Sequence, residues 1–374
     1  MLKGIYLTLL VGPTVPVPVP QPVLDALTSV QVTNAAGQRS GFQLTFTFNN
    51  RSPLHPLFLL GTVQTPKLRV IVVLTVNGMP EVLTDGIVGN SEMSPGSQPG
   101  QSTLTISGKD VSVLMDLEEH NGTEFPGTSP EARVEQILGN YAALGIVPMV
   151  IPSPFSESPS PTDKTPQQEG TDFRYINHLA GEVGHVFYIE AGPMPGMNKA
   201  YWGPDVKTGT PQPALNVDMD AYTNVESLSF NMNTQERTMP VVFIKLPDTN
   251  QFLEVPVPDI SPINPPLGAI ELPPQRFEML NDTAQLSTAQ ACGRALALAS
   301  RTADGVTGTG SLDVVRYGRV LKARQLVGVR GAGVAFDGLY YVTSVTSTIK
   351  KGEFKQSFNL ARNGIVSTVP MVPA

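Results

Sequence analysis

Cysteine and long apolar segments are scarce in this sequence of 374 residues. The single cysteine, Cys292, excludes an internal disulfide and any metal site built from several cysteines. It lies on a predicted helix face with Leu296 and Ala299, which favours a small buried side chain over a reactive thiol. Beyond the first residues, the longest apolar run is Val70–Leu74, far short of the ~20 residues that cross a bilayer. We therefore expect no membrane span.

Charged residues are also few, at 15% of the chain, whereas a typical soluble domain has about 25%. A surface so poor in charge is expected where neighbouring subunits cover it, and equally where loops are simply rich in proline and serine. The net charge is −7, and no block of like charges occurs. Because binding to phosphates needs Lys and Arg, this balance argues against sequence-independent nucleic-acid binding.

The first residues, MLKGIYLTLLVG, lack the small-residue cleavage pattern of a signal peptide. Ile5, Leu7 and Leu9 alternate with other residues instead, which is typical of a strand. We expect a soluble cytoplasmic product without an export signal.

Most of the chain has the alternation and turn residues of β structure. In Phe42–Phe48 every second residue is apolar, and the residues between are Gln43, Thr45 and Thr47, which predicts a half-buried strand. Asn77-Gly78 predicts a two-residue hairpin turn. The predicted strands are Ser29–Thr33, Phe42–Phe48, Lys67–Val76, Glu81–Val88, Ser102–Ser107, Glu226–Met232, Val241–Leu246, Ser311–Tyr317, Gln325–Val329, Leu339–Thr348 and Phe354–Ala361.

Helices are predicted mainly in the middle of the chain. One covers 130–144, with Thr128 and Glu131 as a capping box, and another covers about 288–301, capped by Ser287. In 171–190 a helix starts at Thr171 or Asp172, ends at Gly184 and leads into a strand. The apolar face of this helix consists of Phe173, Ile176, Leu179, Ala180 and Val183. Asp110 is expected to cap a further short helix.

The segments between these elements are predicted as loops or linkers. The ranges 13–22, 148–170 and 255–275 are rich in proline, 89–100 is a polar loop, and 192–214 is a Gly/Pro loop that holds Trp202. The order of elements predicts a mainly β fold with an α+β insertion.

Side chains that could carry chemistry are not grouped into a known motif. His178 and His185 are seven residues apart, without a carboxylate cluster, and solvated or capping roles are favoured over metal ligation. Glu118 and Glu119 precede His120, as an acid/base pair would, but a solvated helix end is the preferred interpretation. We predict no catalytic, cofactor-binding or metal-binding residue.

Three segments, in this order, resemble the late control protein D family, the central hubs of contractile phage tails and related injection machines. They are T-L-T-I-S-G-K-D-V-S-V-L-M-D at 103–116, the helix–strand unit D-F-x-x-I-x-x-L-A-x-E-x-G-x-x-F-Y-I within 171–190, and a C-terminal run. That run comprises S-T-A-Q-A-C-G-R-A-L-A at 287–297, V-G-V-R-G-A-G-V-A-F-D-G-L-Y-Y-V-T-S-V-T-S-T at 327–348 and G-E-F-K-Q-S-F-N-L-A-R at 352–362. The proline runs at 13–22, 148–166 and 255–274 depart from the family pattern.

The resemblance implies two tube-type β-barrel domains, flanking and interrupted by mixed α/β segments. The expected division is 1–117 for the first barrel, 118–220 for an α/β middle domain, and 221–248 with 305–366 for the second barrel. Residues 249–304 are expected to form a proline-rich insertion with one helix that packs with the middle domain.

The implied function is that of a structural, non-enzymatic hub in the baseplate of a virion or injection particle. A homotrimer would join a sixfold tail tube to a threefold spike and seed tube assembly. Its expected partners are a spike protein on a separate polypeptide, a tail tube or tube-initiator protein, other baseplate proteins and a tape measure protein. No cofactor, specific nucleic-acid binding or membrane span is expected. The alternative is a β-rich cell-wall hydrolase or cell-wall-binding protein with an unrecognised site.

Overall fold

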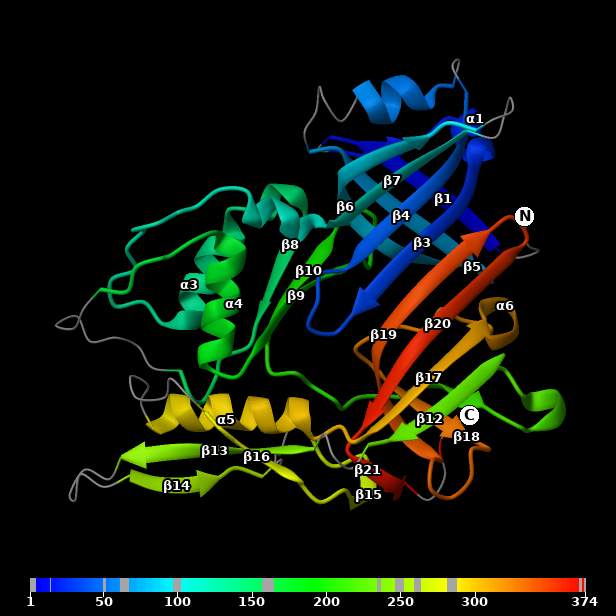
Figure 1. The fold of residues 1–374 in the computed structure, drawn as a ribbon. Helices are drawn as coiled ribbons and strands as arrows, with labels where there is room; N and C mark the ends of the chain where they lie inside the picture. The colour runs from blue at the N-terminus through cyan, green and yellow to red at the C-terminus, as the bar shows by residue number, and fades with distance from the viewer. Residues whose placement is uncertain are drawn as a thin grey trace.

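The computed structural model is a mainly β protein with a small number of helices (Figure 1). It describes residues 5–13, 15–49, 52–60, 67–96, 102–156, 165–233, 237–245, 252–258, 264–280, 288–369 and 372. The predicted predominance of β structure is confirmed.

Across the described ranges, one large sheet contains 13 strands drawn from both ends of the chain. In chain order they are β1 (Ile5–Gly12), β2 (Val17–Pro18), β3 (Leu27–Ala35), β4 (Gly41–Phe48), β5 (Arg69–Val76), β6 (Met79–Ser94), β7 (Ser102–Asp110), β11 (Gln212–Asn216), β12 (Ser227–Met232), β17 (Val306–Asp313), β18 (Leu326–Arg330), β19 (Gly338–Lys350) and β20 (Glu353–Arg362). Hydrogen bonding follows the order β12-β17-β20-β19-β3-β4-β7-β6-β5-β1-β2, and β18 and β11 branch from β19.

The long strand β19 joins the N-terminal half of this sheet to the C-terminal half. Its first residues pair with β18, and residues 344–350 pair with β3. Two separate, closed barrels were expected, but among the described residues the sheet is one open, strongly curved surface (Figure 1). The halves are merged because β19 is long enough to pair with β18 and with β3 at different points along its length.

Side-chain alternation places a large apolar cluster on one side of this sheet. Phe42, Leu44, Phe46 and Phe48 of β4 are all buried, as their spacing predicts. The same cluster includes residues from β1 through β20, so both halves contribute to one continuous core.

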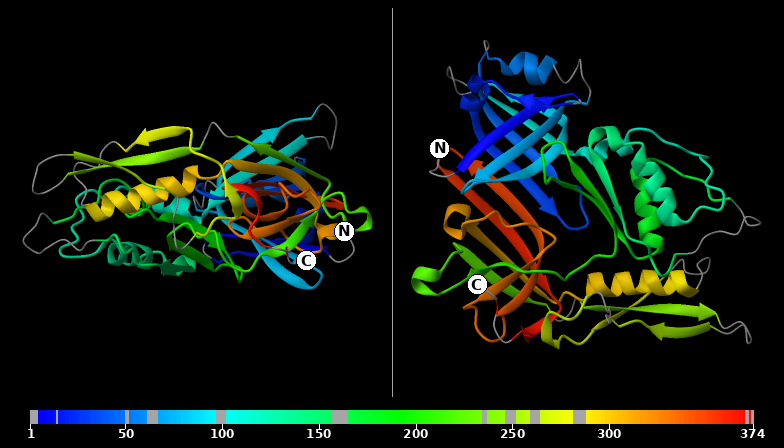
Figure 2. Two further views of the ribbon diagram at one scale, coloured as in Figure 1. Left: turned by 90° about the horizontal axis from the view of Figure 1, so that it is seen from below. Right: turned by 180° about the vertical axis from the view of Figure 1, so that it is seen from behind.

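A smaller α/β unit lies beside the N-terminal half (Figure 2). Its helices are α3 (Pro130–Gly139) and α4 (Asp172–Glu182), and its sheet has the order β8 (Ile146–Val150), β10 (Asn198–Gly203) and β9 (Val186–Ala191). Trp202 of β10 is fully buried, and its Nε1–H donates to the carbonyl of Ile176 at 3.3 Å. The prediction that 192–214 is a loop was therefore wrong, since β10 and the start of β11 lie within it. The glycine and proline residues around these two short strands favoured the prediction of a loop.

The segment 171–190 folds as predicted. Thr171 caps α4 by accepting from the N–H of Arg174, and Gly184 takes a φ of +74° after the helix. The N–H of His185 then returns to the carbonyl of Ala180 at 2.7 Å, which is the bonding of a Schellman motif. An added Cβ at Gly184 would also lie 2.5 Å from the carbonyl oxygen of Gly293. Glycine is thus needed here for its φ and for the close approach of α5.

A third layer is formed by helix α5 (Thr288–Thr302) on a small sheet, in the order β14 (Phe252–Pro256), β13 (Thr238–Lys245) and β16 (Arg276–Met279). Val242, Ala291 and Ala295 pack between helix and sheet. The predicted cap, Ser287, lies outside the described residues. The remaining short elements are α1 (Gln21–Ala26), β15 (Gly268–Glu271), α6 (Val314–Tyr317), β21 (Gly364–Ser367) and helical turns at His55–Leu60, Val111–Asp116, Ala142–Leu144 and Asp220–Tyr222.

Three local predictions need correction. The cap of α3 is Ser129, whose Oγ accepts from Ala132, and not Thr128. Strand β6 continues to Ser94, where a polar loop was expected, because its last residues pair with β7. The strand predicted at Ser311–Tyr317 ends at Asp313, whose carboxylate accepts from the next N–H groups and starts α6. The expected cap at Asp110 is confirmed.

A buried ion pair links the large sheet to the α/β unit. Arg69 of β5 donates two hydrogen bonds of 2.6 Å to Asp85 of β6, and both side chains are almost fully buried. Asn198 of β10 donates to the same carboxylate at 2.9 Å, and Arg69 also reaches the carbonyl of Gly196. The α/β unit is therefore held on the sheet by hydrogen bonds to charged groups.

Candidate functional site

One face of the large sheet is lined by hydroxyl and amide side chains across eight adjacent strands, from β12 to β6. We call it the polar face. Register brings its members into neighbouring rows, so that alternate residues of each strand point to the same side. They are Ser227, Ser229, Asn231, Thr307, Thr309, Ser311, Ser357, Asn359, Ser344, Thr346, Thr348, Gln31, Thr33, Gln43, Thr45, Thr47, Thr103, Thr105, Ser107, Asn90, Glu92 and Ser94.

Side chains of neighbouring strands are bonded to one another on this face. The hydroxyl oxygens of Ser227 and Ser311 are 2.8 Å apart. Asn359 donates to the Ser344 hydroxyl at 2.8 Å, and the hydroxyl oxygens of Thr33 and Thr346 are 3.1 Å apart where the two halves meet. Such cross-strand polar pairs fix the strand register and use hydrogen-bonding groups that would otherwise be offered to a ligand.

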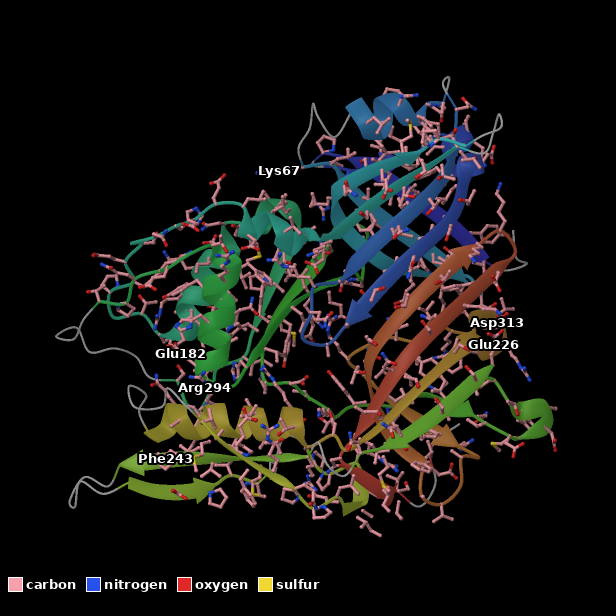
Figure 3. The ribbon with its side chains drawn as sticks, viewed as in Figure 1. Lys67, Glu182, Glu226, Phe243, Arg294 and Asp313 are labelled. Carbon is pink, nitrogen blue, oxygen red and sulfur yellow. The ribbon has the colours of Figure 1, made fainter. Side chains whose placement is uncertain are left out.

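Charge is confined almost entirely to the ends of the polar face. Glu92 is the one charged member of the rows given above. At one end Lys355 lies 3.0 Å from Glu226 and 3.2 Å from Glu353, and Glu226 and Asp313 lie close together there (Figure 3). The carboxylates around Lys355 raise the pKa of its ammonium group. Toward the opposite end the face is hollowed by a cavity of about 630 Å³, which Arg39 and Lys109 line together with uncharged neighbours.

The two outer strands of the polar face have open edges. Within the described part of the chain, strand β12 pairs only with β17. Strand β6 pairs with β5 through Met79–Ile87 and with β7 through Gly86–Ser94, so residues 90–94 have a strand neighbour on one side only among the described residues. Unpaired strand edges are sites where another chain can add by backbone hydrogen bonding.

The residues singled out by sequence do not converge on one site. His120 Nδ1 lies 2.8 Å from Asp172 Oδ1. The same buried carboxylate accepts from Gln168 at 2.6 Å and from Tyr141 at 2.8 Å. These bonds tie the segment around His120 to the start of α4, and burial together with Asp172 raises the pKa of Tyr141.

The other histidines are dispersed. His178 is exposed on α4 and lies 3.4 Å from Glu182, as expected of a solvated side chain. His185 is 4% exposed and meets the Trp202 ring edge-on, with ring centroids 4.5 Å apart. The prediction of a solvated or capping histidine was wrong for His185, because the turn at Gly184 directs the chain inward. Its burial lowers its pKa to about 4.

No metal site or membrane helix emerges in the part of the chain that the structure describes. There, no three His, Cys, Asp or Glu side chains are grouped as a metal ion would require. No helix within the described ranges has the length and apolarity to cross a membrane. Cys292 is half-buried on α5.

The polar face was missed as a site by sequence reasoning, although part of its signal was visible. Gln43, Thr45 and Thr47 alternate with buried residues in β4, and the same spacing of polar residues recurs in β7 and β17. The alternation indicates a solvent-facing side for each strand. It does not indicate that eight such strands lie next to one another.

Comparison with known proteins supports the fold. No family model matches the chain, and no curated protein matches it by sequence. A tail protein from Neisseria meningitidis superposes with a TM-score of 0.62 at 13% identity, covering 97% of this chain and 98% of that one. The 43 kDa tail protein of prophage MuSo2 from Shewanella oneidensis gives 0.64 at 13% identity, covering 96% and 98%.

A third match is a chain of the Francisella PdpA-VgrG complex, with a TM-score of 0.57 at 10% identity. It covers all of this chain and 60% of that longer one. At these identities the likeness establishes the fold, which this chain shares with the two tail proteins over nearly its whole length. The tail-hub resemblance drawn from the three sequence segments is confirmed at that level.

Proposed function

We propose that the chain is a structural hub in the baseplate of a contractile tail or injection machine, acting as a homotrimer without enzymatic activity. The observation that carries the proposal is the polar face, which crosses both halves of the sheet and has an open strand edge at each end. The fold shared with two tail proteins, one of them from a prophage, supports the same class of function.

The open edges suggest how copies would join. Strand β12 of one copy would lie beside residues 90–94 of β6 in the next copy, in a head-to-tail contact. Such heterologous contacts close into a ring when the rotation between copies allows it. Each copy would supply two four-stranded segments, so three copies would present six similar segments around an axis. Closure would turn the polar face into the wall of a tube and cover the open edges of β12 and of residues 90–94.

In this arrangement the polar face would line the axial bore. Hydroxyl and amide groups would keep such a wall hydrated, and many of them are already bonded to one another. Because few charged groups lie among them, the wall would not hold a passing polyanion. The salt-bridged group at Lys355 and the cations Arg39 and Lys109 would then lie toward the two ends of the bore.

The proposed division of the chain is 1–117 for the first tube segment, 118–220 for the α/β unit, 221–248 with 305–366 for the second tube segment, and 249–304 for the insertion. The proposed partners are a separate spike protein, a tail tube or tube-initiator protein, which the hub would seed, and further baseplate proteins. A VgrG complex is the subject of one of the matched structures, which is consistent with a spike-proximal position.

The molar mass of the purified chain tests the proposal. Sedimentation equilibrium should give a concentration-dependent species of three times the 40.0 kDa of one chain. A persistent monomer that degrades purified peptidoglycan would contradict the proposal and favour the cell-wall hydrolase.

A substitution at the β12 edge identifies the contact. The N–H of Asn233 donates to the carbonyl oxygen of Gly305, just before β17. Because the backbone N–H groups of successive residues in a strand point to opposite edges, the N–H of Met232 points away from β17, toward the open edge. Met232→Pro should remove that donor and weaken trimer formation by about tenfold. Met232→Ala shortens the same exposed side chain but keeps the N–H, and should assemble like the original chain. Equal assembly of both variants would show that this edge is not the contact.

A further inference from the structure

A cavity of about 310 Å³ opens at a corner of the N-terminal half, at the end of the polar face where Lys350 pairs with Ser29. It lies where the start of β1 passes the start of β3, beside α1 and the tip of the β19–β20 hairpin. Its wall is aliphatic and comes from five elements. The lining side chains include Ile5, Leu7, Leu24, Leu27, Leu74 and Ile349.

One edge of β1 is open along this corner, whereas its other edge pairs with β5 along the whole strand. Leu9 accepts from Val19 on the side of β1 away from β5, so the backbone groups of Leu9 face that side. Because backbone N–H and C=O groups of alternate residues point to the same strand edge, those of Leu7 and Ile5 face it too. Strand β2 covers this edge only opposite Leu10 and Val11. The groups of Ile5 and Leu7 thus have no partner among the described residues.

The mouth of the cavity carries more positive than negative charge. Lys350 and Lys351 line it, with Asp25 as the one carboxylate. Gln21 donates to the Asp25 carboxylate at 2.9 Å, and Lys351 donates to the Asp25 carbonyl at 3.0 Å. Lys350 is exposed, and its ammonium group forms no ion pair or hydrogen bond with the described residues.

We propose that this corner is a docking site for an extended strand of a partner protein. The strand would pair with the open edge of β1, place apolar side chains at alternate positions into the cavity, and bring a carboxylate beside Lys350. The free backbone groups favour a polypeptide over a lipid, since only a polypeptide offers donors and acceptors at the matching spacing. The cavity volume is at the lower end of the range for ligand pockets, roughly 300–1,000 Å³, and suits a few side chains and not a folded domain.

The probe for this site is a short fluorescein-labelled peptide in which Thr and Val alternate and the C-terminus is Glu-Glu. Fluorescence anisotropy with the purified full chain should show saturable binding below about 1 mM. A matched peptide, N-methylated on the edge that would face β1, keeps its apolar side chains but loses the donors. Its binding should be weaker by about tenfold or more.

Charge reversal tests the role of the two lysines at the mouth of the site and leaves the aliphatic lining side chains unchanged. The double variant Lys350→Glu/Lys351→Glu should bind the acidic peptide about tenfold more weakly. Lys67→Glu, a single charge reversal at the exposed position before β5 labelled in Figure 3, is the control for a distant charge change and should bind as the original chain does. Lack of peptide binding, equal binding of the N-methylated peptide, or equal losses in both charge variants would overturn the proposal. The measurement does not depend on trimer formation, so its outcome is separate from that of the proposed function.

Discussion

Thr33 and Thr346 are 313 positions apart in the sequence, yet their hydroxyl oxygens lie within 3.1 Å of each other where β3 pairs with β19. This contact joins the two halves of the polar face. The rows of hydroxyl and amide groups continue through it without a charged residue, from Ser227 on β12 through Ser357 on β20 to Thr33. A face with this continuity is a property of the whole chain and of neither half alone.

The buried ion pair between Arg69 and Asp85 should be costly to break. Asp85→Ala would leave the Arg69 guanidinium buried without its partner, and Asn198 would lose its acceptor as well. We expect a loss of about 3–5 kcal/mol in the free energy of unfolding, measured by urea denaturation. Glu190→Ala removes the partner of Lys199 from a pair that is more than a third exposed, and should cost less than about 1 kcal/mol. Similar losses in the two variants would contradict the expectation that burial makes the Arg69–Asp85 pair more costly to break than an exposed pair.

The glycine at position 310 should control the position of β12. An added Cβ there would lie 2.5 Å from the carbonyl oxygen of Ser227 and 2.7 Å from the Phe358 ring. Gly310→Val should therefore displace β12, lower stability by about 1–3 kcal/mol and reduce assembly. Thr307→Val, at an exposed position on the same strand, adds no volume near the backbone and is the control. Thermal unfolding and sedimentation of both variants check the prediction, which fails if Gly310→Val assembles normally.

Local elements were largely predictable from the sequence, whereas their arrangement was not. Helix α4 was found because Thr171, the apolar spacing and Gly184 all act within a few residues of one another. Strand β10 was missed because its burial depends on α4, whose Ile176 carbonyl accepts from Trp202. The polar face depends on pairings such as β3 with β19, which no local pattern encodes. The family resemblance supplied the mainly β class with its α/β insertion, but not the single open sheet that replaces two barrels, and it could not say which side chains share a face.

His185 should make stability depend on pH in a defined window. Burial lowers its pKa to about 4, below the usual 6.5, so between these values the unfolded chain binds a proton that the folded chain does not. The resulting stability is present above pH 6.5 and is lost as the pH falls toward 4, by up to about 3 kcal/mol. His185→Gln should flatten this part of the profile relative to the original chain. His178→Gln, at an exposed position on α4, should leave it unchanged. Urea denaturation at several pH values between 4 and 8 distinguishes these outcomes, and parallel profiles for both variants would refute the assignment to His185.

The lack of charge on the polar face should keep nucleic acid from binding there. Thr45, Thr309 and Thr346 lie on three strands of the face, and replacing all three by Arg would cluster positive charge on it. We expect the triple variant to bind a short DNA duplex at low salt, with an affinity that falls steeply as salt is added. The control variant carries the same added charge as Arg at Thr8, Thr123 and Thr208, which are exposed positions in separate parts of the chain, and should bind much more weakly. Fluorescence anisotropy over a salt series measures both. If the original chain already bound DNA as tightly as the triple variant, a non-adhesive role for this face would be untenable, because its hydroxyl groups would then be holding the polyanion that they are proposed to let pass.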